Sequence, residues 1–403
     1  MTESMYSARY LASQPSKVSP RLESTRFTPH ASSSIDNVMI KYLGSKKRLI
    51  PVLGDMLSRS GATTALDMFT GTTRVAQEFK RRGAVVTAVD LARYSKVFAD
   101  CWIATNASDV STSELDDALR HLSFLKGEAG YFTQTFCVDS RFFQPKNGER
   151  VDAIREVLEK DYKESSLYSI LLTSLILAAD RVDSTTGVQM AYVKQWADRS
   201  FKDLDLRKPE LLLGTGTALR GDAIELAPTL GHFDLAYLDP PYNQHRYFSN
   251  YHIWETLVEW DKPEHYGVAC KRVDVRDDST KSRFNEKRNM PDAFRSVIKS
   301  LDADTLVLSY NNESWVSQEE LHDMCSNYQE VRLLAFDSKR YVGAQIGIFN
   351  PSGKKVGEVS HLRNHEWVVV AGDRKVVERM TEQYPVNNQG VVTNGGTTST
   401  TVE

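Results

Sequence analysis

The stretch Ala65-Leu66-Asp67-Met68-Phe69-Thr70-Gly71-Thr72-Thr73 reads as an apolar strand and a glycine turn, and a helical pattern follows over Val75–Arg82. This order is typical of the first turn of nucleotide-binding α/β folds. Gly71 lets the backbone approach a ligand closely, and the free N–H groups at the helix N-terminus suit a carboxylate. A simple tight turn has the same pattern, so that alternative stays open.

The same alternation of strand and helix continues along the chain. Apolar strands are expected at Ala65–Phe69, Val85–Val89, Leu235–Leu238 and Thr305–Ser309, with helical stretches around them. We therefore predict an α/β fold with a doubly wound, Rossmann-like sheet. Residues 101–206 interrupt this rhythm with helical segments, among them Val151–Glu159 and Leu167–Ala179, and predict an inserted, mainly helical subdomain.

Composition suggests the limits of the folded part. Residues 1–38 are rich in Ser, Arg and Thr, and residues 384–403 in Asn, Gly and Thr, so we expect a disordered arm and a disordered tail. Between them we place two parts of one catalytic domain, residues 39–100 and 207–383, around the subdomain at 101–206. We also hypothesise that translation starts at Met39 rather than Met1.

The net charge, the cysteines and the hydropathy of the chain limit which classes of function are possible. The formal net charge of −3 neither supports nor excludes a nucleic-acid partner. The four cysteines stand far apart, without metal-ligand spacing, so we predict no metal site and buried, reduced thiols: Cys101, Cys137, Cys270 and Cys325. No apolar run approaches the length of a membrane span, and we expect a cytoplasmic protein.

The segment Asp234-Leu235-Ala236-Tyr237-Leu238-Asp239-Pro240-Pro241-Tyr242 carries the strongest chemical signal. The exocyclic amine of adenine is a poor nucleophile, and Asp239 with the carbonyl of Pro240 can accept both of its hydrogens. The two prolines stiffen this loop, and Tyr242 can stack on a base that has been flipped out of a duplex. The alternative is a strand followed by an ordinary proline turn.

A second acidic residue ends the strand Val85–Val89. Asp90 follows Asp67 at about the spacing at which a carboxylate meets ribose hydroxyls in dinucleotide-type folds. It could equally be a helix N-cap. The full G-x-G-x-x-G fingerprint is absent from this turn, which weakens a nicotinamide interpretation.

Asp239-Pro240-Pro241-Tyr242, together with Asp67–Thr72 and Lys41–Lys46, resembles the D12 class of adenine-specific DNA methyltransferases, and the resemblance spans about Ile40 to Val370. It implies S-adenosylmethionine as cofactor and N6 of adenine as the methylated atom. Met68 and Thr72 depart from the family pattern, which more often has proline and a second glycine there. The implied cofactor-binding residues are Tyr42, Lys46, Asp67, Phe69, Gly71, Thr72, Asp90, Asp222 and Asp239.

The middle region, with motifs such as Gly130-Tyr131-Phe132 and Thr186-Gly187, resembles the variant of this family that is common in restriction-modification systems. The resemblance gives residues 101–206 a target-recognition role. It implies double-stranded DNA as substrate and a cognate restriction endonuclease as a partner, and we take a monomer as the default. Basic residues interleaved with aromatics suggest contacts to the DNA backbone at Arg141, Lys146, Lys194, Arg246 and Tyr247. Such charges are equally often a solvated surface.

Other chemistries remain as alternatives. Cytosine C5 methylation needs a thiolate nucleophile, usually in a Pro-Cys pair, and none of the four cysteines follows a proline. Cytosine N4 methylation uses similar geometry, but the corresponding loop of those enzymes more often begins with Ser. By resemblance to the adenine-specific family, Asp239 therefore favours adenine. An RNA or protein amine methyltransferase on the same fold stays open, as does a non-enzymatic DNA-binding module.

Overall fold

The computed structural model describes residues 39–44, 46–241, 244, 246–311, 314–339, 348–349, 355–357, 363–386 and 392. The predicted disordered arm at 1–38 lies outside these residues, as does almost all of the predicted tail at 384–403. All described residues belong to one compact unit, Val38–Glu403.

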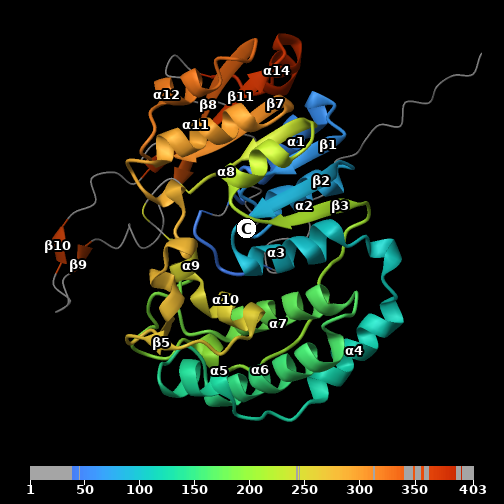
Figure 1. The fold of residues 1–403 in the computed structure, drawn as a ribbon, viewed down its shortest axis with the longest axis vertical. Helices are drawn as coiled ribbons and strands as arrows, with labels where there is room; N and C mark the ends of the chain where they lie inside the picture. The colour runs from blue at the N-terminus through green and yellow to red at the C-terminus, as the bar shows by residue number, and fades with distance from the viewer. Residues whose placement is uncertain are drawn as a thin grey trace, which may run out of the picture. The chain divides into compact units, whose positions relative to one another are not determined.

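A seven-stranded sheet forms the centre of this described unit (Figure 1). In spatial order its strands are β3 (Gly216–Arg220), β2 (Val85–Asp90), β1 (Thr64–Asp67), β4 (Phe233–Leu238), β7 (Ala303–Asn311), β11 (Arg363–Gly372) and β8 (Glu330–Lys339). The strands from β3 to β7 pair in parallel, whereas β11 is antiparallel to both of its neighbours. The predicted strands fall on β1, β2, β4 and β7, so the predicted sheet is confirmed.

Both faces of the sheet are buried, as the near-continuous apolar strands require. Along β4, Leu235 and Tyr237 face one core, while Ala236 and Leu238 face the other. The first face is covered by the helices α1 (Ile50–Ser60), α2 (Arg74–Arg81), α3 (Arg93–Ala99) and α14 (Arg374–Thr381). The second face carries α8 (Ala223–Leu226), α11 (Met290–Ser300) and α12 (Gln318–Met324).

A mainly helical region adjoins the first face (Figure 1). Residues 101–206 contribute α4 (Thr112–Phe124), α5 (Tyr131–Thr133), α6 (Pro145–Val157) and α7 (Tyr168–Val182) to it. Later segments join them: α9 (Tyr247–Asn250), α10 (His252–Glu259) and the hairpin of β5 (His265–Tyr266) and β6 (Lys271–Arg272). The remaining described strands, β9 (Ile348–Phe349) and β10 (Lys355–Gly357), pair only with each other.

This helical region shares its core with the sheet. One continuous apolar cluster runs from strand residues such as Val86 and Leu235 to Leu175 of α7. Side chains also join the segments, since Arg155 of α6 is fully buried and donates to the carbonyl oxygens of Leu257 and Val258 on α10. All four cysteines are buried, as predicted.

The shared core predicts a common loss of stability. Leu175→Ala should remove about 2–5 kcal/mol from the free energy of unfolding, because it leaves a cavity in a fully buried position. Urea denaturation followed by both far-UV circular dichroism and tryptophan fluorescence would measure it. Coincident shifts of both signals are expected, and a shift confined to one of them would contradict a single shared core.

Candidate active site

The order of the strands places the site. The chain winds outward from β1 through β2 to β3 on one side, and from β4 to β7 on the other, so β1 and β4 meet at a reversal of the winding. Ligands of open α/β sheets bind in the crevice at the carboxyl ends of such strands. Asp67 ends β1 and Asp239 directly follows β4, which brings the two predicted acids to this point.

Asp67 ties the end of β1 to the start of α2. Its Oδ2 accepts hydrogen bonds from Thr70 Oγ1 at 2.8 Å and from the amide of Ala76 at 3.1 Å, in the first turn of α2. Its Oδ1 is buried and accepts no hydrogen bond from any residue that the structure describes. Burial, together with the charge of nearby Asp239, raises the pKa of Asp67 to about 7.

The glycine turn is braced by Asp90. Gly71 has a φ of +52°, and its amide donates to Asp90 Oδ2 at 2.7 Å, while the amide of Ala92 donates to Asp90 Oδ1 at 2.9 Å. Burial raises the pKa of Asp90. The N-cap residue of α3 is Ala92, so Asp90 holds the turn rather than capping the helix.

Tyr42 closes over this turn. A Cβ atom added at Gly71 would lie 3.1 Å from the ring of Tyr42. That ring stacks on Tyr251 with 4.8 Å between centroids, and on Tyr247 with 5.3 Å. The hydroxyl oxygen of Tyr251 accepts a hydrogen bond from the amide of Leu43 at 2.7 Å. Lys41 Nζ donates a hydrogen bond to Asp180 Oδ2 at 2.9 Å. The segment before α1 is thus attached to α7 and α10, which lie in the helical region.

Lys46 joins two carboxylates. Its ammonium lies 3.0 Å from Asp239 Oδ1 and also forms an ion pair with Glu366 of β11. Only 5% of the Lys46 side chain is exposed, whereas 17% of the Asp239 side chain remains accessible to a substrate. Burial raises the pKa of Asp239 to about 6; the Lys46 charge lowers it and the Glu366 charge raises it.

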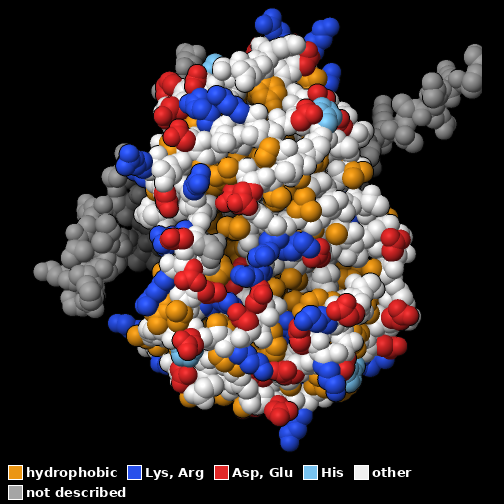
Figure 2. Space-filling model, viewed as in Figure 1, with side chains coloured by type: hydrophobic (Ala, Val, Ile, Leu, Met, Phe, Trp, Pro, Cys, Tyr) orange, Lys and Arg blue, Asp and Glu red, His pale blue; other side chains and the backbone are white. Residues whose placement is uncertain are grey.

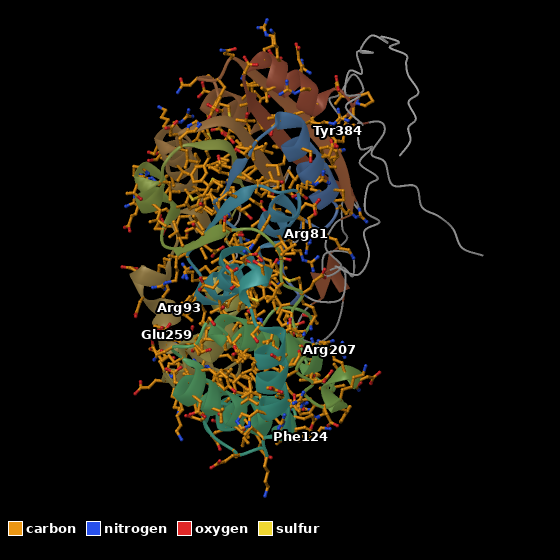
Figure 3. All side chains as sticks on the ribbon, turned by 90° about the vertical axis from the view of Figure 1, so that its right-hand side faces the viewer. Arg81, Arg93, Phe124, Arg207, Glu259 and Tyr384 are labelled. Carbon is orange, nitrogen blue, oxygen red and sulfur yellow. The ribbon has the colours of Figure 1, made fainter. Side chains whose placement is uncertain are left out.

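A second buried acid fixes α3, which follows Asp90. Glu255 of α10 accepts a hydrogen bond at 2.9 Å from the backbone amide of Arg93, which is the first residue of α3. Figure 3 shows Arg93 beside Glu259, with which its guanidinium forms an ion pair. The Glu255 side chain has no exposed surface, and burial raises its pKa to about 7.

The remaining predicted cofactor residues lie at the same edge. Asp222 follows β3 and caps α8 by accepting the amide of Ile224 at 2.8 Å. Phe69 packs edge-on against Phe284, with 5.0 Å between ring centroids. Thr72 is buried in the glycine turn.

The predicted DNA contacts are only partly brought together. Arg141 stacks over Trp196 at 4.8 Å and donates to the carbonyl of Lys194, whereas Lys146 forms an ion pair with Asp203 at 2.5 Å. Arg246 precedes α9 and is exposed, and Tyr247 stacks on Tyr42 beside the glycine turn. Tyr242 lies outside the described residues.

Surface charge is mixed. Figure 2 shows lysine and arginine side chains interspersed with aspartate and glutamate over the face in view, which matches the small net charge.

Glu366 and Trp196 are site residues that the sequence analysis missed. Glu366 had a weak signal, because it is a glutamate directly before the apolar run Trp367–Val370. Trp196 had none, since its partner Arg141 lies far away in the sequence. Glu255 lies in the segment Tyr247–Thr256, which resembles the part of the family that leads into the next helix, but its partner Arg93 was not predicted.

With this geometry established, the chain can be compared with known proteins. Residues 42–324 match the family described as D12 class N6 adenine-specific DNA methyltransferase. The chain belongs to this family. The match contains the glycine turn, the helical region and Asp239, so the resemblance drawn from sequence motifs is confirmed.

Among curated proteins, the chain is 30% identical to "Modification methylase StsI" of Streptococcus sanguinis over 72% of its own length and 46% of that protein. It is 27% identical to "Type II methyltransferase M.NlaIII" of Neisseria lactamica, over 80% of its length and 98% of that protein. The chain therefore spans about half of the first relative and nearly all of the second.

Among the described residues, no helix combines the length and apolarity needed to cross a bilayer.

Asp67 should make stability depend on pH. Because its pKa is raised from 3.8 to about 7 on folding, its contribution to stability is complete below pH 4 and is lost as the pH rises to about 7. In wild type, the free energy of unfolding should therefore fall as the pH rises from 4 to 7. Asp67→Asn should make this slope less steep, by up to about 1.4 kcal/mol per pH unit. Urea denaturation at several pH values measures this slope.

Asp234→Asn is the matched control. Hydrogen bonds from Thr63 and Thr64 lower the pKa of Asp234 to about 2, so its removal should leave the slope between pH 4 and 7 unchanged. Equal slopes for wild type and Asp67→Asn would show that Asp67 is not protonated in the folded protein at these pH values.

Proposed function

We propose that this chain is an S-adenosylmethionine-dependent DNA methyltransferase that methylates N6 of adenine in double-stranded DNA. The observation that carries the proposal is the carboxylate of Asp239. It stands at the end of a buried strand, at the point where the winding of the sheet reverses, in a chain of the D12 class family.

Asp239 is assigned to orient the amine. Its carboxylate and the carbonyl of Pro240 accept the two amine hydrogens, so that the nitrogen lone pair points toward the methyl donor. Pro240 and Pro241 keep these acceptors in place before substrate binds, which lowers the cost of reorganisation in the transition state. A base in a duplex cannot reach this position, so the adenine must be flipped out, and Tyr242 is assigned to stack on it.

S-adenosylmethionine, when bound, supplies an electrophilic methyl group. The strand ends fit such a molecule, because the buried Oδ1 of Asp67 lacks a donor within the described structure and can accept one from a ligand. We assign the cofactor to the edge formed by the ends of β1, β2 and β3. Its proposed contacts are Tyr42, Lys46, Asp67, Phe69, Gly71, Thr72, Asp90, Asp222 and Asp239.

The helical region is assigned to recognition of the target DNA, with Arg141 and Lys194 contacting phosphates beside Trp196. Lys146, Arg246 and Tyr247 stay in the proposed contact set. The names of the relatives favour a role in a Type II restriction-modification system, with a cognate restriction endonuclease as partner. We further propose a cytoplasmic enzyme that acts as a monomer.

The decisive experiment follows methyl transfer directly. Unmethylated plasmid DNA is incubated with the protein and S-adenosylmethionine, and the nucleosides are analysed by mass spectrometry. Wild type should produce N6-methyladenine, and Asp239→Ala should reduce it by at least about 10³-fold while cofactor affinity stays within a few fold, because Asp239 acts in the transition state.

Two results would contradict the proposal. Turnover by Asp239→Ala at the wild-type rate would remove Asp239 from the mechanism. Wild-type protein that binds the cofactor but methylates no DNA base would redirect the search to RNA and protein amines, which the same assay can test with those substrates.

Arg141 gives a separate test of the DNA surface. Arg141→Ala should weaken binding to duplex DNA, and the slope of log affinity against log salt should become smaller by about 1, because one phosphate contact is lost. Arg120→Ala is the matched control, since Arg120 is also exposed but pairs with Asp117 on α4. Identical salt slopes for wild type and Arg141→Ala would contradict the assigned contact.

A further inference from the structure

We propose that Glu366 is a positioning residue for methyl transfer, which holds the ammonium of Lys46 so that Asp239 remains free to accept the substrate amine. The inference rests on the function proposed for Asp239.

The antiparallel direction of β11 brings Glu366 to the site. The strands from β3 to β7 end at the catalytic edge, and β11 instead begins there, with Glu366 opposite Asn311 at the end of β7. Asp239 follows β4, on the other side of β7. Lys46 comes from the segment before α1, and its ammonium contacts both carboxylates. Three distant parts of the chain thus meet over the end of β7.

The contacts of Lys46 give Glu366 this role. The ammonium lies 3.0 Å from Asp239 Oδ1, which is itself a buried atom, and it donates a hydrogen bond to Glu366. Without this acceptor the ammonium would direct more of its hydrogens to the carboxylate that the substrate amine must use. When the amine binds, Lys46 keeps Glu366 as a charged partner, which limits the cost of weakening its ion pair with Asp239.

The charges around Asp239 are consistent with this role of Glu366. In the described part of the chain, the charged and titratable groups that interact with Asp239 are Lys46, Glu366, Asp67 and the hydroxyl of Tyr237. The Lys46 charge lowers the pKa of Asp239, and the Glu366 charge raises it. Removing the charge of Glu366 therefore has two effects: the pKa of Asp239 falls, and Lys46 loses one of its two carboxylate partners.

The test uses Glu366→Gln, which keeps the shape of the side chain and removes its charge. Single-turnover methylation of plasmid DNA is measured from pH 5 to pH 9 with saturating cofactor and DNA, so that the profile reports groups in the bound complex. We expect the plateau rate to fall roughly 10- to 100-fold, which is the loss typical when residues that orient metal-binding side chains are replaced. The acid limb of the pH–rate profile, where the rate falls at low pH, should move to lower pH.

Two further variants sharpen the result. Glu366→Asp retains the charge and should recover part of the rate and return the acid limb toward wild type. Glu330→Gln is the matched control on the neighbouring strand β8, where Glu330 pairs with Arg332 and Arg374, and it should leave both rate and profile unchanged.

A wild-type rate and profile in Glu366→Gln would overturn the inference. So would a loss of rate with an unmoved acid limb, because that pattern indicates a merely structural role. If Glu366→Gln does not fold, Glu366→Ala decides: a lowered rate with an acid limb moved to lower pH supports the role, and a wild-type profile overturns it. Absence of N6-methyladenine with the wild-type protein would instead refute the proposed function.

Discussion

The parallel pairing of β1 with β4 is the contact on which the site depends. Ala65, Leu66 and Asp67 lie opposite Leu235, Ala236 and Tyr237, so the two strands end side by side. Asp67 and the residue that follows β4, Asp239, then face the same crevice, although 172 positions separate them in the sequence (239 − 67). Burial raises the pKa of both acids, and for Asp67 the charge of Asp239 raises it further. The burial follows from the helices that cover both faces of the parallel strands.

Hydrophobic patterning was sufficient to predict four strands of the sheet, β1, β2, β4 and β7. Their buried residues face two cores, and this gives short apolar runs that lead to polar residues such as Asp67, Asp90 and Asp239. Patterning could not predict β11 as a partner of β7, because antiparallel insertion of a late strand leaves no local signal. It also could not show that α10 packs with the helical region, since the contact of Leu257 with Arg155 joins positions 102 residues apart.

The candidate site was predictable where chemistry is local in sequence. The turn around Gly71 and the loop after Asp239 each occupy a few consecutive residues, and each contains side chains whose type indicates their role. The partners of these residues were not predictable. Glu366 and Glu255 act through ion pairs and hydrogen bonds across the fold, and a single glutamate in a sequence does not indicate what it contacts. The motifs thus identify the groups assigned to the reaction, and the fold identifies those that hold them.

The position of β11 in the middle of the sheet has a consequence for biosynthesis. Because β11 separates β7 from β8, the sheet cannot acquire its final order until residue 372 has left the ribosome. A nascent chain that ends before β11 lacks Glu366 and leaves one side of β7 without the hydrogen-bonding partners that β11 supplies. Lys46 and Asp239 could meet in such a chain, but without the second carboxylate. The order of translation therefore makes the joining of Lys46, Asp239 and Glu366 one of the last events in folding.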